Sequence, residues 1–435
     1  MKIAIIGGGA SGIVTAHLLQ KQGHQITVFE REPILGGHIR TLNQNVQPNR
    51  WRSLSVRGAS RREGQSDCNL ILENGVLEFP TTFHNFIALM TELEIELEPV
   101  NIGSALFLKN GNHYLSKVAI DRNFTGIKRS IESWRMNLFY LRSVSLLIAA
   151  KFWQIIDFHN ISVADSFQQP SLQHTWLKLF AMYSYSIPFP QIDDCPAELV
   201  IPTLRDDVFV DWVRIKGGVY SYIQKILDRF QGEILLGVEV AAIRRTATGV
   251  TIELTDGKPQ EFDKVVFATP PDQVLKLLAD PHPEEINRFA AWQGNHIQTL
   301  LHTDADMYAP YQVKQGSEFD FFETANQNGN WGYNARLNQL CGITSPVQYS
   351  LSFNLESLIA PDRILHLQQH HTPLYTVAAF RHRQEIIATN GEFNTYHVGA
   401  YLGDGLHEGA ITSAMRVAAL IATTEVRGEG MVLSC

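Results

Sequence analysis

The first thirty residues place a glycine-rich turn between two apolar runs, and this order restricts the fold more than any other feature. An apolar run at 2–6 is followed by Gly7-Gly8-Gly9-Ala10-Ser11-Gly12, which satisfies the G-x-G-x-x-G pattern, and by helical spacing of apolar residues over 13–20. A second apolar run at 25–29 ends at Glu30, roughly 20 residues after the glycines. This order predicts a strand, a helix and a parallel strand, the unit that binds a dinucleotide.

Each residue of the turn has a physical role in such a unit. Gly7 permits the tight turn from strand to helix, Gly9 leaves room for a pyrophosphate beside the backbone, and Gly12 lets the helix pack close to the sheet. The helix N-terminus, at Ala10 and Ser11, presents unpaired N–H groups and the positive end of the helix dipole to phosphates.

Glu30 bears on which dinucleotide is bound. An acid at the end of the second strand accepts hydrogen bonds from ribose hydroxyls, and its charge repels a ribose 2′-phosphate. Arg31 beside it weakens that repulsion slightly. We therefore expect a dinucleotide without a 2′-phosphate, and not a purely structural turn.

A second glycine-rich turn lies near the other end of the chain. Residues 396–411 read as a strand followed by a turn with several glycines, and the apolar residues over 412–423 have helical spacing. The N-terminus of this second helix is expected to face another part of the same ligand. Two such turns at opposite ends of the chain predict a long cofactor that both of them hold.

The composition is that of an ordinary globular enzyme. With 435 residues, the chain is expected to form two domains or a discontinuous pair. The net charge of −8 gives no support for nucleic-acid binding, and no apolar stretch is long enough to cross a bilayer. The four cysteines lack metal-ligand spacing and the first strand starts at residue 2, so we expect a cytoplasmic protein without structural zinc.

Six further motifs carry a resemblance to the flavin-containing amine oxidase superfamily, and in particular to its bacterial branch of predicted NAD/FAD-binding proteins. Leu35-Gly36-Gly37-His38 resembles the G-G-R/H motif, and Glu73 to Phe79 resembles the D-T-G-x-x-x-F stretch near the flavin ring. The remaining four are similar to the glycine turn that returns the chain to the flavin domain, the V-x-x-I strand at the adenine, the A-T-P-P signature and the C-terminal flavin motif; they lie at 216–220, 236–243, 265–271 and 399–416.

The resemblance implies FAD as the cofactor, and it implies contacts from residues of these motifs. In this family pattern Val240 meets the adenine, Asp404 reaches ribityl or phosphate-side groups through water, and Glu408 satisfies helix N-terminal donors. The expected cofactor-binding residues are Gly7, Gly9, Ala10, Ser11, Gly12, Glu30, Arg31, Gly36, Gly37, His38, Asn74, Gly75, Val240, Ala268, Thr269, Gly403, Asp404, Glu408, Gly409 and Ala410.

The expected fold class is α/β. It comprises a Rossmann-like FAD-binding domain of the glutathione-reductase type, with a parallel sheet and a β-meander, interleaved with an α+β substrate domain. The FAD-binding domain would take residues 1–80, 210–290 and 390–435, and the substrate domain residues 81–209 and 291–389. Helical patterns are expected over 84–97 and 131–182, and a hairpin signal stands at Asp256-Gly257.

The chain departs from the amine oxidases at two positions. Where those enzymes carry a lysine near flavin N5, the best match here is Gln298. Where they carry one ring of an aromatic cage for the amine, this sequence has Leu406. Both departures make amine oxidation a less favoured expectation than the family resemblance alone suggests.

Three residues are candidates for catalytic roles. Tyr185 and Trp331 are expected to supply aromatic walls, together with their neighbours Tyr183 and Tyr333. His407 lies in the second glycine turn, where a neutral imidazole moves protons near physiological pH. The alternative is that His407 only caps the turn or contacts the ring. The apolar pattern of 131–182 is either ordinary helical core or a channel for a long apolar substrate.

Two other segments are prominent in the sequence. Residues 47–65 are polar and rich in arginine, and they are expected to form either a solvated surface loop or a cationic lid for an anionic tail. His366, His370 and His371 cluster without an acid that would complete a ligand set, so we expect no metal site there.

These observations predict an FAD-dependent oxidoreductase that takes a hydride from an organic, largely apolar substrate onto flavin N5, in desaturation, reduction or isomerisation of a C–C bond. An amine or amino-acid oxidase acting on a C–N bond is the first alternative, and a non-catalytic FAD-stabilised scaffold is the second. The expected partner is a small molecule, including one with an acyl chain or carboxylate. The oligomeric state stays open.

Overall fold

The first half of the structure is built on a five-stranded parallel sheet. The computed structural model of the chain describes residues 1–47, 70–152, 158–166, 171–207, 210–324 and 331–432. The sheet has the order β10-β2-β1-β14-β20, and every neighbouring pair is parallel. Its strands are β1 (Lys2–Ile6), β2 (Gln25–Glu30), β10 (Glu233–Leu236), β14 (Lys264–Phe267) and β20 (Thr395–His397).

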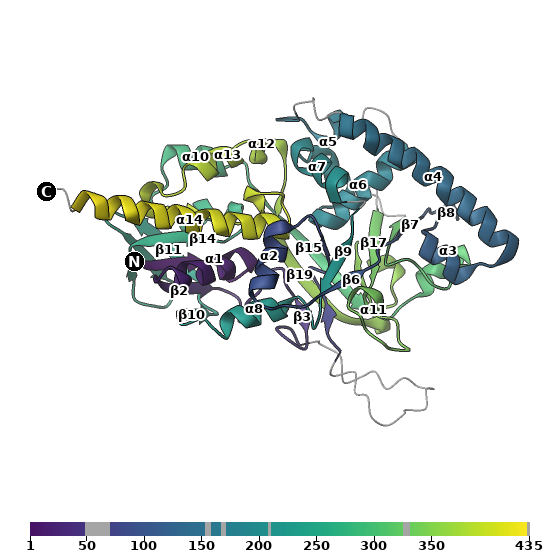
Figure 1. The fold of residues 1–435 in the computed structure, drawn as a ribbon, viewed down its shortest axis with the longest axis horizontal. Helices are drawn as coiled ribbons and strands as arrows, with labels where there is room; N and C mark the ends of the chain where they lie inside the picture. Colours follow the sequence, from purple (N-terminus) through teal and green to yellow (C-terminus); the bar gives the residue numbers. More distant parts are fainter. Residues whose placement is uncertain (48–69, 153–157, 167–170, 208–209, 325–330, 433–435) are drawn as a thin grey trace, which may run out of the picture.

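The two predicted glycine-rich turns follow β1 and β20, and both of these strands pair with β14. The turns therefore lie at the same edge of one sheet, separated by a single strand. The helix after the first turn, α1 (Ala10–Lys21), packs against the C-terminal helix α14 (His407–Val432) (Figure 1). Apolar residues on these helices and on α8 (Tyr220–Leu227) bury one face of the sheet, and the strands are apolar on both faces as expected for a parallel sheet.

A three-stranded antiparallel meander leads into β14. It consists of β11 (Val240–Arg245), β12 (Val250–Leu254) and β13 (Gln260–Phe262). The hairpin signal at Asp256-Gly257 falls in the turn between β12 and β13, as predicted.

A seven-stranded mixed sheet forms the second half, in the order β19-β15-β18-β17-β16-β7-β8. All its pairs are antiparallel except that β16 runs parallel to β7. Its strands are β7 (Ser104–Phe107), β8 (His113–Tyr114), β15 (Gln293–His302), β16 (Phe319–Glu323), β17 (Trp331–Arg336), β18 (Ser350–Phe353) and β19 (Ile364–Leu374).

A group of helices packs on this sheet and reaches the nucleotide half. The long helix α4 runs along the outer edge of the molecule in Figure 1, with α6 beneath it. The helices of this region are α3 (Lys117–Asn123), α4 (Gly126–Phe152), α5 (Val163–Ser166), α6 (Leu172–Tyr185) and α7 (Ala197–Asp207).

Short elements connect the two halves. Two small sheets lie between them, β3 with β4 and β5-β9-β6. The strands are β3 (Thr41–Leu42), β4 (Leu72–Glu73), β5 (Phe79–Pro80), β6 (Leu97–Val100) and β9 (Trp212–Ile215). The remaining α-helices of the molecule are α2 (His84–Glu92), α9 (Val274–Leu277), α10 (Pro283–Phe289), α11 (Leu337–Leu340), α12 (Val377–Phe380) and α13 (Arg383–Ala388).

The predicted α/β fold class, with its parallel sheet and meander, is confirmed. The helix expected over 84–97 ends earlier than predicted, because Glu94 adopts a left-handed φ of 57° and the chain then enters β6. The helical patterns expected over 131–182 correspond to α4, α5 and α6. The domain boundaries stay a prediction.

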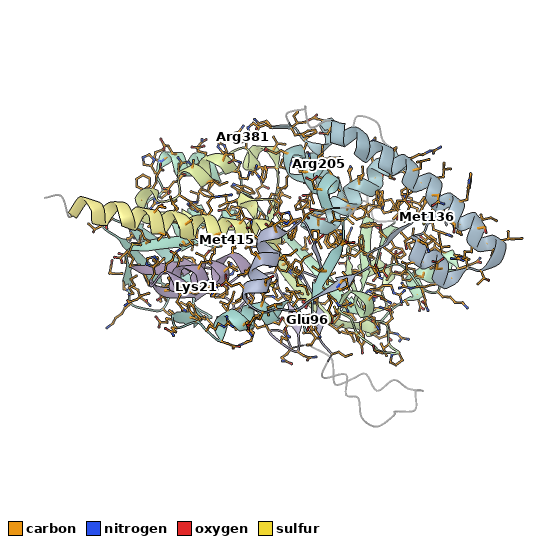
Figure 2. All side chains as sticks on the ribbon, in the orientation of Figure 1. Lys21, Glu96, Met136, Arg205, Arg381 and Met415 are labelled. Atoms are coloured by element: carbon orange, nitrogen blue, oxygen red, sulfur yellow. The ribbon has the colours of Figure 1, made fainter. Side chains whose placement is uncertain are left out.

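Apolar side chains fill the space between the layers, and charged ones such as Lys21, Glu96 and Arg381 are exposed (Figure 2). One core cluster lies between the parallel sheet and its helices. Another extends from the meander to α6 and the seven-stranded sheet, and it includes the fully buried Trp176. The candidate site lies where these two bodies of packed side chains face each other.

Candidate active site

A cavity of about 730 Å³ lies between the parallel sheet and the seven-stranded sheet, and residues of both line it. On the first side the lining includes Gly7 and Gly9, which follow the carboxyl end of β1. On the second side it includes Thr299 of β15 and Phe319 of β16. Ligands of parallel α/β sheets bind outside the carboxyl ends of the strands, which is where this cavity opens.

The two N-terminal glycine motifs meet at the cavity floor. Gly9 and Gly36 form an isolated parallel bridge, and the backbone N–H of Gly36 donates to the Gly8 carbonyl at 2.9 Å. A Cβ on Gly37 would lie only 3.0 Å from the Cα of Gly9. The sequence segments that were predicted to touch one ligand are therefore in contact with each other, with bare backbone facing the cavity.

Gly7 and Gly12 shape this turn from within. Gly7 has a φ of +110°, a conformation that costs other residues free energy. A Cβ on Gly12 would overlap the carbonyl oxygen of Gly7. Gly9, at the N-cap of α1, makes no side-chain hydrogen bond to the helix, so the first N–H groups at Ala10 and Ser11 stay available to phosphate oxygens.

Glu30 is fixed in the position expected of a ribose-binding acid. Its Oε2 accepts from the Gly8 N–H at 2.7 Å and its Oε1 accepts from the Glu32 N–H at 2.9 Å. The side chain lines the cavity, and each oxygen keeps a lone pair for a ribose hydroxyl. Arg31 also lines the cavity; its side chain is half exposed and lies 3.7 Å from Glu32.

Two further residues show that the cavity fits the diphosphate and hydroxyl groups of FAD. Arg40 is 8% exposed and lines the cavity, with no carboxylate within ion-pair distance among the described residues. Desolvation lowers its pKa, while Glu30 and Glu32 act to raise it. Thr269, in the A-T-P-P signature, has a buried hydroxyl without a hydrogen-bond partner in the described part of the chain. A buried cation and an orphan hydroxyl are both satisfied by a polar, anionic cofactor.

Two acids of the C-terminal turn, Asp404 and Glu408, accept hydrogen bonds from backbone N–H groups. Asp404 Oδ1 accepts from the N–H groups of Leu406 and Gly409, both at 2.8 Å, and burial raises the pKa of this acid to about 6. Glu408 accepts from the backbone of Asn85 and Phe86 at 2.9 and 2.8 Å. Glu408 does satisfy helix N-terminal donors, but those of α2 instead of its own helix. Neither acid is among the described residues that line the cavity.

Gly75 and Asn74 lie where the chain crosses toward the second half. A Cβ on Gly75 would overlap the His38 carbonyl. Asn74 Oδ1 accepts from the Thr299 hydroxyl at 2.8 Å, and the same hydroxyl lies 3.1 Å from His370 Nε2. This chain of hydrogen bonds joins the loop after β4 to β15 and β19, across the junction of the two halves.

The strand position assigned to the amine oxidase lysine is refined by the structure. Gln298 does not line the cavity in the described residues; it accepts a hydrogen bond from Gln369 at 2.6 Å on the exposed side of β15. Its neighbours Ile297 and Thr299 line the cavity instead, because successive side chains of a strand point to opposite faces. Neither Ile297 nor Thr299 carries an amine, and the assignment of the lysine position to Gln298 stays a prediction.

His407 is enclosed by other side chains. Its Nε2 lies 2.8 Å from the Tyr222 hydroxyl, and its ring packs edge-on against Phe79 and Phe86 at 5.2 and 5.6 Å. Desolvation lowers the pKa of His407 to about 4, so the imidazole is neutral at physiological pH. The ring also borders the cavity. Proton transfer by His407 stays a prediction.

The two aromatic candidates differ in position. Tyr185 lines the cavity, and its hydroxyl lies 2.8 Å from Thr203 Oγ1 and donates to the Asp404 carbonyl at 3.2 Å. Trp331 is buried against Phe189, with ring centroids 6.2 Å apart, and it is not among the described lining residues. Tyr333, two residues further along β17, takes the place expected of Trp331.

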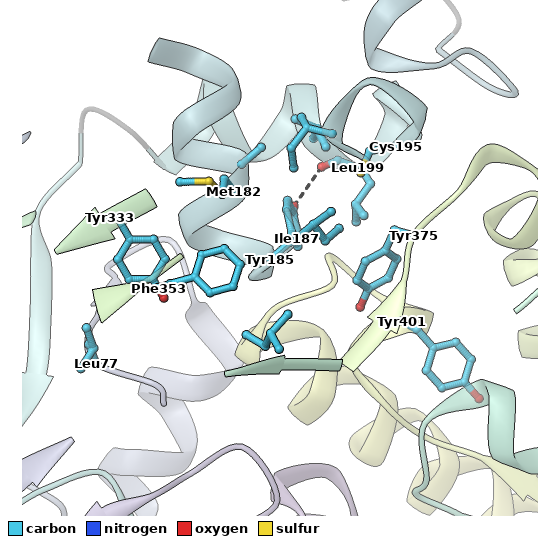
Figure 3. Close-up of a cluster of buried hydrophobic side chains, with 14 of the residues drawn as sticks. Leu77, Met182, Tyr185, Ile187, Cys195, Leu199, Tyr333, Phe353, Tyr375 and Tyr401 are labelled. Carbon is cyan, nitrogen blue, oxygen red and sulfur yellow. Dashed lines mark hydrogen bonds between the residues drawn. The ribbon is translucent and has the colours of Figure 1, made fainter. Parts of the chain in front are cut away.

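Tyr185, Tyr333, Tyr375, Tyr401 and Leu77 all line the cavity, and Figure 3 shows them among neighbouring buried hydrophobic side chains. Burial holds the pKa of each of these tyrosines above its ordinary value. All four hydroxyls are therefore protonated at physiological pH.

The structure brings most of the predicted site residues to one cavity. Those that line it are Gly7, Gly9, Ala10, Ser11, Glu30, Arg31, Gly36, Gly37, His38, Gly75, Val240, Ala268, Thr269, Ala410, Tyr185 and His407. Gly12, Asn74, Gly403, Asp404, Glu408, Gly409 and Trp331 stand behind that lining. The arginine-rich segment 47–65 lies outside the described residues, apart from residue 47.

Sequence reasoning did not single out many of the lining residues, and Arg40, Glu78 and Thr299 are the polar ones among them that matter most here. Arg40 and Glu78 fall inside or beside motifs that were recognised, but which way their side chains point depends on strand pairing. Glu78 is the most unusual, since it is 8% exposed and burial raises its pKa to about 7, against the effect of a hydrogen bond from Tyr183.

The fold and the cavity define a flavin-binding oxidoreductase in which both ends of the chain supply the cofactor site. The sequence model of the flavin-containing amine oxidoreductases matches residues 10–301. The chain belongs to this family, whose cofactor is FAD.

Individual relatives are more distant. The chain is 22% identical over 301 residues to the flavin-dependent L-tryptophan oxidase RebO of Lentzea aerocolonigenes, an alignment that spans 64% of this chain and 59% of that protein. A stretch of 45 residues is 40% identical to a 4,4′-diapophytoene desaturase of Staphylococcus aureus, covering 10% of this chain and 9% of that one.

Solved structures share the fold. The conjugated-linoleic-acid-producing fatty acid isomerase of P. acnes superposes with a TM-score of 0.67 at 14% identity, covering 97% of this chain and 98% of the other. Putrescine oxidase bound to putrescine gives 0.65 at 13% identity, covering 97% and 99%. None of the helices in the described ranges combines the length and apolar composition needed to cross a bilayer.

Proposed function

We propose that this protein is an FAD-dependent oxidoreductase that takes a hydride from a C–H bond of a small organic molecule with a mainly apolar body. The favoured chemistry is desaturation, reduction or isomerisation at a C–C bond. The observation that carries the proposal is the single cavity shared by the glycine turns and by aromatic side chains of the other half. A substrate in the aromatic part lies in the same enclosure as the cofactor.

The residues of the chain supply binding and exclusion of water, while bound FAD supplies the hydride acceptor. Phe180, Tyr183 and Phe319 form one aromatic wall, with Phe180 and Phe319 centroids 5.5 Å apart and Tyr183 stacked on Phe319 at 4.5 Å. Such a wall holds an apolar body by burial of its surface. Ile297 and Thr299 take the lining positions beside the lysine position of the amine oxidases.

Amine or amino-acid oxidation is the second candidate, and one observation favours it. Glu78 lines the cavity, and no cation contributes to its electrostatic surroundings in the described structure. An ammonium group would give it one. Leu406 at the cage position and the lack of a lysine on β15 weigh against this candidate.

Anaerobic absorption spectra of the purified holoenzyme distinguish the candidates. Loss of the oxidised flavin bands on addition of unsaturated fatty alcohols or other apolar alkenes and alkanes, or a shift of the double bond in such an alkene without net loss of the bands, supports the favoured chemistry. Loss with amines or amino acids alone supports the second candidate. A yellow protein that no compound of either panel reduces, that isomerises no alkene of the panel, and that no artificial electron donor converts to a form active on alkenes, would contradict both.

A further inference from the structure

Glu78 is a buried acid in the cavity wall with one oxygen unsatisfied. The Tyr183 hydroxyl donates to Oε1, whereas Oε2 is buried without a hydrogen-bond partner among the described residues. The residue is only 8% exposed and it lines the cavity. A buried oxygen without a partner is costly, and in native proteins it usually marks a place that a water or ligand fills.

The surroundings hold this carboxyl group without neutralising it. Tyr183 stacks on Phe319 and packs edge-on against Tyr333 at 5.0 Å, so its hydroxyl is fixed toward Glu78. The titratable groups that face Glu78 are Tyr183 from α6, Tyr333 from β17 and Cys341, which follows α11. Burial raises the pKa of all three, so each is uncharged at neutral pH.

On the basis of the proposed function, we propose that Glu78 Oε2 anchors the substrate head group and selects molecules whose head group donates hydrogen bonds, a hydroxyl or an ammonium, over those that end in a carboxylate. A donor completes the hydrogen bonding of Oε2 in a site of low polarity, where such a bond is strong. A carboxylate brings a second negative charge to the same site, and like charges in a buried site raise the free energy of binding. This excludes the carboxylate head group that the sequence left open.

Three ligands of equal chain length test the selection: n-hexylamine, 1-hexanol and n-hexanoate. Each is titrated into the holoenzyme and followed by the flavin difference spectrum and by calorimetry. At pH 8 we expect the amine and the alcohol to bind at least about tenfold more tightly than hexanoate, the ratio for one charge-assisted hydrogen bond. Glu78→Gln is expected to remove most of that preference.

The pH dependence gives an independent readout. Burial raises the pKa of Glu78 from 4.5 to about 7, so the carboxyl group ionises as the pH rises through 7. Hexylamine affinity should therefore increase and hexanoate affinity decrease over this range. Both slopes should vanish in Glu78→Gln. Tyr183→Phe keeps the ring, removes the donated hydrogen bond and should move the midpoint upward.

Glu239→Gln is the matched control, since Glu239 also lines the cavity but is exposed beside Val240. It should retain the wild-type preference. A Glu78→Gln variant that binds FAD and keeps the wild-type order of the three ligands would overturn the anchor. A protein that shows the preference but is reduced by no substrate would leave the anchor standing and contradict the proposed function.

A second inference rests on the outer face of α4. Five large apolar side chains are exposed there at spacings of four and three residues, which places them in one stripe along the helix. They are Ile127, Ile131, Trp134, Leu138 and Leu141, with exposed fractions of 80, 52, 66, 38 and 69%. Contiguous exposed apolar surface of this kind marks an interaction site.

The charges beside the stripe indicate its partner. Residues 126–143 contain four basic residues and one acidic residue, in a chain of net charge −8. The acid, Glu132, is bound by Arg135 at 3.0 Å, and Arg129 pairs with Asp121 of α3 at 2.7 Å. A helix with tryptophan and aliphatic residues on one side and lysine and arginine beside them is typical of binding to anionic membrane surfaces. Pairing with a second copy would bring these basic flanks together.

The inner face of α4 leads toward the cavity. Phe139 packs on Trp176 with centroids 5.9 Å apart, and Trp176 packs on Phe180 at 4.7 Å. Phe180 lines the cavity. Apolar side chains therefore continue from the exposed helix to the candidate site.

We infer that the stripe on α4 docks on the surface of an anionic lipid bilayer. The full-length holoenzyme should co-sediment with phosphatidylcholine vesicles that contain phosphatidylglycerol, less with pure phosphatidylcholine, and less at high salt. The double variant Ile131→Ser/Trp134→Ser should weaken binding about tenfold or more by loss of buried apolar area. Ile286→Ser on α10, at a side chain 44% exposed, is the matched control.

The alternative is that a second copy of the chain covers the stripe, and sedimentation velocity tests it by measuring whether the protein is a dimer. Unchanged vesicle binding by the double variant would overturn the inference. So would a dimer of the wild type that the double substitution dissociates while neither protein binds vesicles.

Discussion

Arg40 is buried beside the two N-terminal glycine turns, and it lines the cavity without an ion-pair partner in the described residues. A guanidinium presents several N–H donors in a plane that matches phosphate oxygens. The neighbouring Arg31 is half exposed and faces solvent as well as the cavity. We therefore assign the main electrostatic contact with the FAD pyrophosphate to Arg40.

Removal of this cation should weaken the cofactor. Arg40→Met keeps most of the apolar stem, and loss of one charged hydrogen-bonding group should raise the Kd of FAD by about 10- to 100-fold. Titration of apoprotein with FAD, followed by quenching of flavin fluorescence, measures the change. Arg31→Met is the control and should have a much smaller effect; equal effects of the two substitutions would contradict the assignment.

Gly9 and Gly12 should differ in what an added methyl group disturbs. A Cβ on Gly9 meets only Gly37, at 3.7 Å, and then points into the cavity. A Cβ on Gly12 overlaps the Gly7 carbonyl. Gly9→Ala should weaken FAD binding with little change in apoprotein stability, whereas Gly12→Ala should lower the melting temperature of the apoprotein itself. Differential scanning fluorimetry with and without FAD distinguishes the two, and identical melting curves would contradict this division.

Local patterns were sufficient to find these glycines and Glu30, because a turn and the acid after the next strand are defined by neighbours in the chain. Glu78 and Thr299 could not be found in this way. Each lies on a strand or beside one, and a shift of one residue moves a side chain to the other face. The pairing of β15 with β19 decides that Thr299 and not Gln298 faces the cavity.

Among the helices, α14 and α2 are joined through Glu408. Its two oxygens accept from Asn85 and Phe86 at the start of α2, whose N-cap residue Phe83 has no side chain for this purpose. The acid therefore completes a helix end that its own sequence leaves unsatisfied. The sequence motif predicted a capping acid at this position, but only tertiary structure reveals which helix is capped.

Glu408→Ala should lower the free energy of unfolding by about 0.5 to 2 kcal/mol, the range for loss of an N-terminal cap. Urea titration of the holoenzyme measures it. The flavin absorption spectrum should stay unchanged, because the side chain is directed at α2. Asp362→Ala, at an acid 83% exposed, is the control. An equal loss of unfolding free energy in both variants would contradict the capping role of Glu408.

Glu73 connects β4 with β3 and with the loop before α8. It accepts from the Thr41 hydroxyl at 2.8 Å and from the Val219 N–H at 2.7 Å. Burial raises its pKa to about 8, against the effect of these two hydrogen bonds. The folded chain therefore favours the protonated acid, whereas the unfolded chain ionises near the ordinary value of 4.5.

The sign of the pH effect follows from this. The contribution of Glu73 is fully present below about pH 4.5 and is lost as the pH rises through about 8. Glu73→Gln mimics the protonated acid, so it should flatten this decline and become the more stable protein at pH 8 to 9. Denaturant titrations of both proteins from pH 5 to 9 measure the difference; parallel curves would contradict a raised pKa.

The limits of sequence patterns are also visible in the helices. The apolar spacing over 84–97 continues past the end of α2, but Leu93 is already buried where Glu94 turns the chain. Periodicity reports which residues are buried, and it does not report the backbone conformation between them. The apolar spacing over 131–182 likewise does not show where α4, α5 and α6 begin and end.

In the molecule as a whole, the cavity lies between the two halves, and several distant segments of the chain together line it. Its lining comes from the N-terminal turns, the meander, the second sheet and the C-terminal turn. The order of motifs predicted that both ends of the chain reach one cofactor. The approach of β15 and β19 to that cofactor depends on packing between the two sheets, which no local pattern encodes.

FAD should therefore stabilise both halves together. A ligand that binds only the folded state adds about 2.7 kcal/mol at a free concentration one hundred times its Kd. We expect one cooperative melting transition for the holoenzyme, at a temperature that rises with FAD concentration, by both near-ultraviolet and far-ultraviolet circular dichroism. Two separate transitions, of which only one responds to FAD, would show that the cofactor stabilises one half alone.

The position of β20 beside β14, and of Ala410 in the cavity wall, has a consequence for synthesis of the protein. A nascent polypeptide that has emerged from the ribosome only as far as the second sheet still lacks an edge of the nucleotide sheet and one wall of the flavin enclosure. Stable capture of the prosthetic group must then wait until β20 and the start of α14 have emerged. Until that moment the growing chain carries an open, largely apolar cleft, which is the state that a chaperone would have to protect.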